Sequence, residues 1–350
     1  MSSLRILVVR NDKLGDFMLA WPALALLKRS LPKSHLSVLV PAYTHSLAEI
    51  CPWVDQVLSD PQDLDQMNRQ HFDAVLTLFS TGRIGWQVFK GRIPIRFAPA
   101  TKWAQVFYNH TVVQRRSRSE KPEFIYNLEL ASALIKYLGK QEAQSLPPYW
   151  PIGTEEKAGL RHELATRLGL DVARPWFFLH SGSGGSANNL SLEQYAQLVI
   201  SMHQQLQREG RHLPQWVLTC GPGEEASVES LHQRMPDDVE AVIYRSKDGL
   251  AAFAKSIATA QLMVAGSTGP LHIAGALDVP TIGFFPAKRS ATPLRWRPCN
   301  GQARTLSFCP ELNGKELTDM STIDVSLCAQ RIASWLSETV LPFPLLRIDP

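Results

Sequence analysis

The sequence lacks the features of a membrane-spanning, secreted or disulfide-stabilised protein. No stretch of about 18 apolar residues runs without charges, so no helix is expected to cross a membrane. The N-terminus already reads as a β-strand and leaves no room for a signal peptide. The five cysteines are scattered and never form a C-x-x-C pair, which indicates reduced thiols and not a disulfide framework or zinc site. These absences predict a cytoplasmic protein.

Several catalytic motifs are also missing. The ten histidines include no H-E-x-x-H sequence and no cluster with metal-ligand spacing, so we expect no metal centre. The absence of a G-x-S-x-G elbow argues against an α/β-hydrolase. No G-x-G-x-x-G follows the first strand, and the glycine-rich loop after residue 180 does not end in G-K-[ST], which argues against standard NAD and Walker sites.

The length and the order of the predicted elements indicate two α/β domains. At 350 residues the chain exceeds one typical core. In the first half, hydrophobic runs predict strands, and helical periodicity predicts two helices, at 16–31 and 124–138. The strands are expected at 4–10, 36–41, 74–79 and 93–98. We expect Pro22 to kink the first helix, and the segment 99–122 shows no clear period.

A second alternation follows the proline-rich stretch 146–154. Strands are predicted at 176–180, 216–220, 241–244, 262–265 and 281–285. Helices are predicted at 192–207, 224–235, 249–258, 271–277 and 325–339. Repeated strand–helix alternation predicts right-handed parallel βαβ units, and hence two Rossmann-like, doubly wound domains that face a cleft. We expect domains at 1–150 and 151–325, followed by a helix and tail at 326–350 that could pack back on the first domain.

Positive charge is concentrated in the first half of the chain. Residues 1–150 carry 18 lysines and arginines against 12 aspartates and glutamates, and from Arg83 to Lys121 nine basic residues accompany a single acid, Glu120. Such a field favours anionic partners: phosphates, carboxylated sugars, nucleic acid or an acidic membrane face. A solvated basic surface is the alternative. Nucleic acid is disfavoured because aromatic residues are not interleaved at stacking spacing. Residues that could rest on an anionic leaflet are Trp86, Phe89, Lys90, Arg92 and Trp103.

The first strand leads into a candidate catalytic acid. After a β-branched run, a short polar turn ends in Gly15 and Asp16, which open an amphipathic helix. Such a turn holds a carboxylate at the C-terminal edge of a parallel sheet, where open α/β folds bind ligands. Asp16 is therefore a candidate general base. The alternative is that it only supports the helix start, where the macrodipole favours an acid.

A second candidate site follows the predicted strand 262–265. Ser267, Thr268 and Gly269 form a tight turn, Pro270 stands where a helix would begin, and His272 follows by one turn. Small residues let a ligand approach the backbone, and free N–H groups at a helix start attract phosphate. A helix start of this composition without any ligand is the alternative.

Two further loops follow strands of the second half. The loop F-L-H-S-G-S-G-G-S-A-N-N offers several N–H donors in a nest suited to a pyrophosphate. In the loop T-C-G-P-G-E-E, Glu224 could hydrogen-bond a nucleoside hydroxyl, although it could equally be an acid that starts a helix.

Four ordered segments resemble glycosyltransferase family 9, the bacterial ADP-heptose:lipopolysaccharide heptosyltransferases. Residues 8–24, V-V-R-N-D-K-L-G-D-F-M-L-A-W-P-A-L, resemble the family's R-x-x-x-x-G-D-x-x-x-x-x-P-A-L opening. Residues 267–286, S-T-G-P-L-H-I-A-G-A-L-D-V-P-T-I-G-F-F-P, resemble its D-T-G-x-x-H block. The sequences L-H-S-G-S and C-G-P-G-E stand where the family has its P-G-A/S and G-G-P-G-D/E loops. The resemblance covers nearly the whole chain in the right order.

The resemblance implies a GT-B fold in which the first domain binds the acceptor and the second binds the nucleotide sugar. It implies an inverting, metal-independent transfer with Asp16 as the general base, which suits a single displacement. The positions that match diphosphate contacts are Thr268, Gly269 and His272. Ser181 and Ser183 stand near the donor loop, and Glu224 near the nucleoside contact.

The acceptor side is expected to be basic. Arg10 and Lys13, beside Gly15 and Asp16, could hold an anionic acceptor such as a Kdo carboxylate or a core phosphate. The same role is expected of a mobile basic stretch that contains Arg115, Arg116, Arg118 and Lys121.

The sequence departs from the family at two donor positions. The family's Asp before T-G is Ser267, and its donor-loop Lys has become Asn188 or Asn189. Loss of that cation removes a charge-assisted contact to the leaving phosphate, an interaction of roughly 1.5–3 kcal/mol. Lys288 and Arg289, after the last strand of the set, are the candidates to replace it.

The expected function is transfer of a heptose from ADP-heptose to the lipopolysaccharide inner core, either Kdo–lipid A or a heptosylated core, at the inner membrane face. No resident cofactor is expected, since the nucleotide sugar is a co-substrate. The alternatives are another nucleotide-sugar donor on the same fold, or a catalytically silent paralogue that binds nucleotide or glycolipid. The sequence leaves the oligomeric state open.

Overall fold

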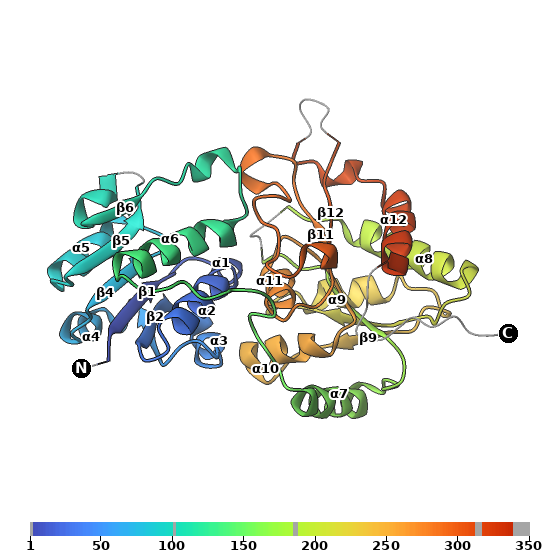
Figure 1. Cartoon of the computed structure of the whole chain (residues 1–350). Helices are drawn as coiled ribbons and strands as arrows, with labels where there is room; N and C mark the ends of the chain where they lie inside the picture. The colour runs from blue at the N-terminus through green and yellow to red at the C-terminus, as the bar shows by residue number, and fades with distance from the viewer. Residues whose placement is uncertain (1–2, 101–102, 185–187, 312–316, 339–350) are drawn as a thin grey trace. The chain divides into compact units, whose positions relative to one another are not determined.

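The computed structural model describes residues 3–100, 103–184, 188–311 and 317–338. The chain divides after Trp150 into two units, each built on one six-stranded sheet with helices on its faces (Figure 1). Within the described ranges, no helix is both long and apolar enough to span a bilayer.

The sheet of the first unit is parallel throughout, in the order β3-β2-β1-β4-β5-β6. Its strands read as hydrophobic runs because helices cover both faces of a parallel sheet. The central strand β1 pairs Val8 with Val38 of β2 and with Leu76 of β4. The strands are β1 (Arg5–Val9), β2 (His35–Pro41), β3 (Gln56–Asp60), β4 (Ala74–Thr77), β5 (Ile95–Pro99) and β6 (His110–Val112).

The helices of the first unit follow these strands in alternation. They are α1 (Leu14–Met18), α2 (Trp21–Ser30), α3 (His45–Glu49), α4 (Leu64–Arg69), α5 (Gly82–Lys90) and α6 (Glu123–Tyr137). Short 3-10 turns are η1 (Ala42–Thr44), η2 (Trp103–Phe107) and η3 (Arg116–Arg118).

The prediction of one kinked helix over 16–31 is wrong. The chain forms α1, breaks at Leu19 and Ala20, and starts again as α2. Pro22 lies in the first turn of α2, where no intrahelical bond needs its missing N–H, so it starts a helix instead of bending one.

The second unit repeats this arrangement, with a sheet order of β12-β11-β10-β7-β8-β9 and all its pairs parallel. Its strands are β7 (Trp176–His180), β8 (Gln215–Thr219), β9 (Ala241–Tyr244), β10 (Leu262–Gly266), β11 (Thr281–Phe284) and β12 (Thr305–Phe308). Its helices are α7 (Thr154–Leu168), α8 (Leu192–Arg208), α9 (Glu225–His232), α10 (Gly249–Ser256), α11 (Gly269–Ala276) and α12 (Val325–Glu338). Short 3-10 turns include η4 (Ile257–Thr259), η5 (Arg289–Ala291), η6 (Gln302–Arg304) and η8 (Met320–Thr322).

Helix α12 belongs to the core of the second unit. Its Cys328, Ile332 and Leu336 lie in the same buried cluster as Val199 and Leu206 of α8, against which it packs. The remaining tail, 339–350, lies outside the described residues, so its packing on the first unit stays a prediction.

The predicted fold class, α/β with two doubly wound parallel sheets, is confirmed. Counted from the first strand of each unit, both sheets have the order 3-2-1-4-5-6 of dinucleotide-binding folds. In both sheets the order in which the strands are added therefore reverses at one point, which lies between β1 and β4 in the first unit and between β7 and β10 in the second.

Candidate active site

Three of the loops that contain predicted site residues lie where the strand order of a sheet reverses. In open α/β sheets, ligands bind outside the carboxyl ends of the strands at such a switch point. The turn after β1 leads to Asp16, and the loops after β7 and β10 contain Ser181 and Thr268. Each unit thus presents part of its predicted site at its own switch point, Asp16 in the first unit and Ser181 and Thr268 in the second.

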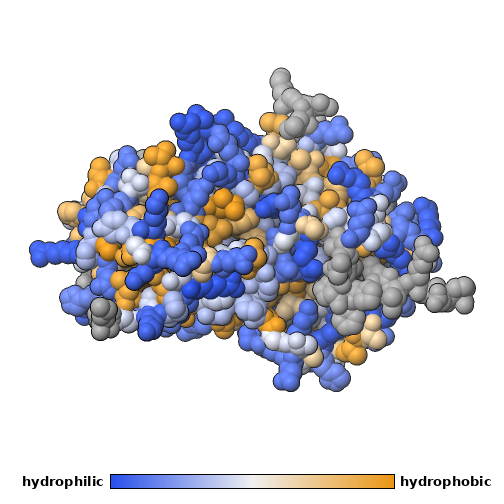
Figure 2. Space-filling view, in the orientation of Figure 1, coloured by the Kyte–Doolittle hydropathy of each residue, from blue (hydrophilic) through white to orange (hydrophobic). Residues whose placement is uncertain are grey.

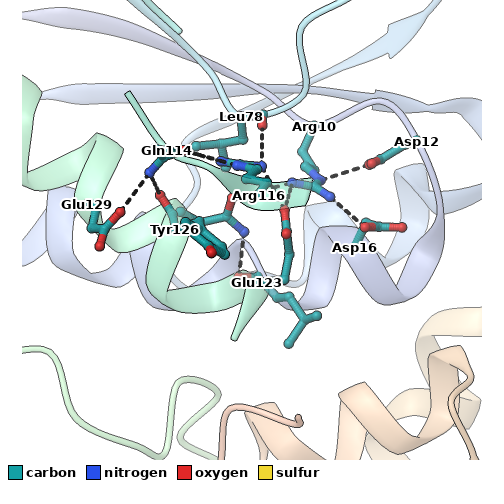
Figure 3. A network of polar contacts seen from close by, with 11 residues as sticks. Arg10, Asp12, Asp16, Leu78, Gln114, Arg116, Glu123, Tyr126 and Glu129 are labelled. Atoms are coloured by element: carbon teal, nitrogen blue, oxygen red, sulfur yellow. Dashed lines mark hydrogen bonds and ion pairs between the residues drawn. The ribbon is translucent and has the colours of Figure 1, made fainter. Parts of the chain in front are cut away.

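Arg10 organises the site of the first unit. It follows β1 directly, and its side chain is buried. Its Nε donates to Asp12 at 2.9 Å, Nη2 to Asp16 at 2.5 Å and Nη1 to Glu123 at 2.9 Å (Figure 3). Arg116 also donates to Glu123, at 2.8 Å, so two guanidinium groups share that carboxylate. A buried arginine is tolerated here because its charge is fully paired.

The burial and ion pairs of this group shift the pKa values of Arg10 and Asp12. Burial lowers the pKa of Arg10, but the carboxylates of Asp12, Asp16 and Glu123 outweigh it and leave the pKa above its ordinary value. For Asp12, burial raises the pKa to about 6, with Arg10 opposing the rise and Asp16 adding to it. Arg10 therefore stays charged, whereas the raised pKa of Asp12 brings its titration to about pH 6.

Asp16 is held in one orientation with one oxygen available. It lies in the first turn of α1, as predicted, and its Oδ1 accepts from Arg10. Within the described part of the chain, no donor contacts Oδ2, and the side chain is 12% exposed. Asn127 of α6 fixes the end of α1 by donating to the carbonyl of Leu19 at 2.9 Å. A carboxylate oriented by one oxygen and open at the other has the geometry of a general base.

Sequence reasoning missed the residues that support Asp16. Glu123 and Asn127 come from a helix more than a hundred positions along the chain, and no local pattern marks them. A second missed group begins at Asn11, the residue after Arg10: Asn11 donates to Asp60 at 2.6 Å, and Arg83 of α5 forms an ion pair with the same carboxylate.

The predicted acceptor-binding cations divide into two groups. Arg10 and Arg116 are buried or nearly so and are paired with Glu123, so they shape the site and do not present free charge. Lys121 pairs with Glu129 at 2.5 Å. Arg118 lies 3.6 Å from Glu120, and both are exposed. Lys13, at the start of α1 ahead of Gly15, and Arg115, just before η3, are exposed, and within the described ranges neither has an ion pair.

In the second unit, the turn after β10 has the features of an anion site. Thr268 precedes α11, its side chain does not cap the helix, and Pro270 lies in the first turn. The N–H groups at the start of α11, beginning with Gly269, therefore have no intrahelical partner. Burial lowers the pKa of His272 to about 4, and its Nδ1 has no hydrogen-bond partner among the described residues. A neutral, buried imidazole is thus held beside the helix start.

Asn189 braces the loop after β7, the predicted donor loop. Its Nδ2 donates to the Ser181 carbonyl at 2.8 Å, and its Oδ1 accepts from the buried Tyr195 hydroxyl at 2.5 Å. Gly266, at the end of β10, leaves the space, because a Cβ there would lie 2.4 Å from Asn189 Oδ1. The amide therefore fixes the loop, and its hydrogen-bonding groups are occupied.

Glu224 holds the neighbouring loop. It accepts backbone N–H groups of Gly184 and Gly221, both at 2.8 Å, and its Oε2 lies 3.8 Å from His180 Nε2. Although burial raises the pKa of Glu224, these backbone bonds and His180 leave it below its ordinary value. Gly182 leaves room for this carboxylate, since a Cβ at that position would lie 1.8 Å from it and displace it. Glu224, which was predicted to contact the nucleoside, therefore holds the loops after β7 and β8 together through its bonds to Gly184 and Gly221.

The remaining predicted donor residues lie around these loops. Asn188 is exposed and donates to the Thr318 carbonyl at 3.0 Å. Ser181, Ser183 and Ser267 are partly exposed. Residues 185–187 of the loop lie outside the described residues. Lys288 and Arg289 follow β11, the neighbour of β10, and are exposed; no ion pair to either exists within the described ranges. Across those ranges, no three His, Cys, Asp or Glu side chains gather in a group that could hold a metal ion.

Comparison with known proteins finds relatives and similar folds over nearly the whole chain. Residues 66–324 match the profile of glycosyltransferase family 9 (heptosyltransferase). The chain is 42% identical, over 95% of its length and 96% of the other protein, to a candidate glycosyltransferase of Haemophilus influenzae. It superposes on the ADP-heptose lipopolysaccharide heptosyltransferase II of E. coli with a TM-score of 0.73, at 18% identity over 96% of this chain and 98% of that one. For the E. coli heptosyltransferase WaaC with ADP, the TM-score is 0.68 at 18% identity, over 95% and 100% of the two chains.

Proposed function

This chain belongs to glycosyltransferase family 9, and we propose that it transfers a heptose from ADP-heptose to the inner core of lipopolysaccharide. The observation that carries the proposal is the state of Asp16: one carboxylate oxygen is fixed by Arg10 and the other is left without a partner among the described residues. An oriented carboxylate with one unpartnered oxygen at a sheet's switch point fits a base that acts on an acceptor hydroxyl.

The proposed reaction is a single displacement. Asp16 removes the proton of the acceptor hydroxyl while that oxygen forms a bond to the anomeric carbon. The bond from the anomeric carbon to the diphosphate oxygen breaks at the same time, and the diphosphate leaves with the electron pair. Attack opposite to the leaving group inverts the configuration at the anomeric carbon. Removal of the proton as the bond forms contributes about 10²–10⁴-fold to such reactions.

The second unit is proposed to receive the leaving diphosphate. The unpaired N–H groups at the start of α11 can donate to an anion, and Thr268 lies at the same turn. His272 is a neutral donor of one ring N–H, and a bound diphosphate would favour its protonated form. No metal ion is needed in this scheme, because backbone dipoles and side-chain donors stabilise the developing charge.

Lys288 or Arg289 is proposed to supply the cation that the family's donor-loop Lys provides. Asn189 cannot do so, since it carries no charge and its amide holds Ser181 and Tyr195. Both cations follow β11, beside the β10 turn that contains Thr268. An exposed cation at this edge of the sheet can form a charge-assisted contact with phosphate.

The acceptor is proposed to be an anionic glycolipid, Kdo–lipid A or a heptosylated core, bound on the first unit. Lys13 and Arg115 carry charge that no carboxylate of the described residues offsets, and they are the first candidates to contact its phosphates or carboxylates. We place the reaction in the cytoplasm, which agrees with five cysteines that are all unbonded.

A different nucleotide-sugar donor is the second candidate, and two residues favour it. Ser267 replaces the family's Asp, and no cation follows the donor loop at Asn188 or Asn189. Thermal-shift measurements with ADP, UDP and GDP at equal concentration separate the two candidates, because a ligand that binds the native state raises the melting temperature by an amount that grows with the logarithm of its affinity. A shift with ADP supports heptose, a larger shift with UDP or GDP redirects the donor, and no shift with any of them contradicts a nucleotide-sugar transferase.

The transfer itself is tested with ADP-heptose and a delipidated Kdo acceptor, by mass spectrometry of the product. Added mass equal to one heptosyl unit on the acceptor supports the proposal. An unchanged acceptor, in a preparation that binds ADP, rejects this donor and acceptor pair.

A further inference from the structure

Aromatic side chains gather on the surface that α5 and η2 form in the first unit. Helix α5 buries Ile84 and Val88 and leaves Trp86 52% and Phe89 47% exposed. From η2, Trp103 is 66% and Val106 71% exposed. Figure 2 shows hydrophobic side chains reaching the surface over the part of the first unit where α5 and β6 lie. We call the residues of α5 and η2 together with Arg92 the α5–η2 surface.

The aromatic rings form one packed cluster around Phe107. Its ring centroid lies 5.9 Å from Trp86, 6.1 Å from Phe89 and 5.8 Å from Trp103. Two glycines of α5 make this packing possible: a Cβ on Gly82 would lie 2.3 Å from the Trp103 ring, and one on Gly85 would lie 2.7 Å from Phe107. The exposed aromatics are therefore held in place by close packing and are not isolated surface residues.

The α5–η2 surface carries positive charge and no negative charge of its own. Lys90 lies one turn after Trp86, and Arg92 follows directly; both are exposed, and within the described ranges neither has an ion pair. The Arg96 guanidinium lies over the Phe89 ring at 5.7 Å. The sequence has no Asp or Glu between Asp73 and Glu120.

We propose that the α5–η2 surface docks on an anionic phospholipid bilayer. Exposed tryptophans with lysines and arginines beside them suit the membrane interface, where amphipathic rings lie at headgroup level and cations attract anionic lipids. An exposed apolar patch of this kind marks either a protein or a membrane contact. The long run without acids favours the membrane, since a bilayer surface is uniformly negative, whereas a protein partner presents both signs.

The docking surface begins at the same sheet edge as the proposed acceptor site. Helix α5 follows β4, and η2 follows β5, so both start at the carboxyl ends of strands. The turn that leads to Asp16 follows β1, a strand of the same sheet. Arg83, in the first turn of α5, pairs with Asp60, to which Asn11 also donates. If the proposed function holds, the surface brings Asp16 to a lipid-anchored acceptor; binding to the bilayer itself does not depend on that function.

The test is cosedimentation of the full chain with vesicles of phosphatidylcholine, with and without phosphatidylglycerol. We expect binding to the anionic vesicles, weak binding to the neutral ones, and a loss of binding as salt is raised. Lys90→Glu and Arg92→Glu should each lower the partition coefficient by at least about fivefold. Trp86→Ala should lower it on both kinds of vesicle. Lys140→Glu, the same charge change at an exposed residue of the same unit outside the surface, and Leu327→Ala, at an exposed residue of α12, should leave it unchanged.

Circular dichroism and melting curves establish that each variant is folded, and Lys90→Glu alters only an exposed side chain. The proposal is overturned by equal partition onto neutral and anionic vesicles, by no binding to either, or by control variants that fall as far as Lys90→Glu. It is also overturned if sedimentation velocity shows that Trp86 mediates self-association. Vesicle binding without sugar transfer would reject the proposed function alone, and transfer without vesicle binding would reject the docking surface alone.

Discussion

Replacing Asp16 with Asn tests the proposed base most directly. Asn keeps an oxygen that can accept from Arg10 Nη2, so the orientation at 2.5 Å can be retained while the proton acceptor is lost. Removal of a general base slows such reactions by about 10²–10⁴-fold, which corresponds to about 3–5 kcal/mol of activation free energy. We expect kcat to fall by this factor while the KM for the nucleotide sugar changes little, because the donor is proposed to bind the second unit.

The variant should fold. Arg10 keeps Asp12 and Glu123 as partners, so no buried charge is left unpaired. One charge-assisted hydrogen bond becomes a neutral one, a loss of about 1–2 kcal/mol of unfolding free energy. A melting curve checks this, and a much larger loss would mean that Asp16 holds the site together and is not free to act.

Asp12→Asn is the matched control, because Asp12 contacts the same guanidinium through Nε. We expect kcat to fall less than about tenfold, since the acceptor's proton does not go to Asp12. The assay is the initial rate of heptosyl transfer, followed by mass spectrometry, over a range of pH. If Asp16→Asn retains most of the rate, or if Asp12→Asn loses as much as Asp16→Asn, Asp16 is not the base.

The same control makes a prediction about stability. The pKa of Asp12 rises from 3.8 to about 6 on folding, chiefly through burial. The native state therefore binds this proton more tightly than the unfolded state, and its contribution to stability falls as pH rises through that window, by at most about 3 kcal/mol. Asp12→Asn should thus gain stability relative to the parent chain between about pH 4 and pH 7. A difference in melting temperature that stays constant across this range would contradict the shift.

Three further predictions concern the second unit. Glu224→Gln should lower unfolding free energy by about 1–2 kcal/mol at neutral pH; because the folded-state pKa of Glu224 lies below 4.5, the deficit should vanish as pH falls through it, which melting curves at several pH values will show. Gly182→Ala should abolish nucleotide binding in calorimetry by displacing the Glu224 carboxylate, whereas Gly159→Ala, in open space on α7, should stabilise the chain by about 1 kcal/mol. Lys288→Ala should weaken ADP binding about tenfold or more, while Arg208→Ala, an exposed cation at the end of α8, should not; equal affinities would remove Lys288 from the donor site.

Buried hydrophobic runs gave the clearest signal in the sequence. Strand β7, which is buried along its whole length, has the predicted bounds, 176–180; β9 also has its predicted bounds, 241–244, although only Tyr244 of that strand is buried. The strands it missed are short or half-buried, as in β6 (His110–Val112) and β12 (Thr305–Phe308). Helix α7 was missed because it buries only Arg161, Leu164 and Ala165, too few to give a clear helical period.

The candidate site shows the same division between local and distant signals. Asp16 and Thr268 were predicted as site residues because a strand, a turn and a helix start can be recognised from adjacent residues, and the structure confirms those local elements. Glu123 was not, because its contact with Arg10 joins residues 113 positions apart and depends on how α6 lies against the sheet. For the same reason, the prediction that Arg116 offers its charge to an acceptor could not foresee that its guanidinium donates to Glu123.

The brace at Asn189 has a consequence for how this lineage can change. A lysine at this position would leave the buried Tyr195 hydroxyl without its acceptor and the Ser181 carbonyl without its donor, a penalty of about 1–3 kcal/mol for each orphaned group. Restoration of the family's cation at position 189 by one substitution is therefore disfavoured unless position 195 changes first, for instance to Phe. We expect descendants of this chain to vary at 189 and 195 together, with Gly266 retained in all that keep the amide. The residue at position 189 is thus difficult to change without a second substitution at 195. A compensating cation elsewhere in the second unit needs fewer substitutions.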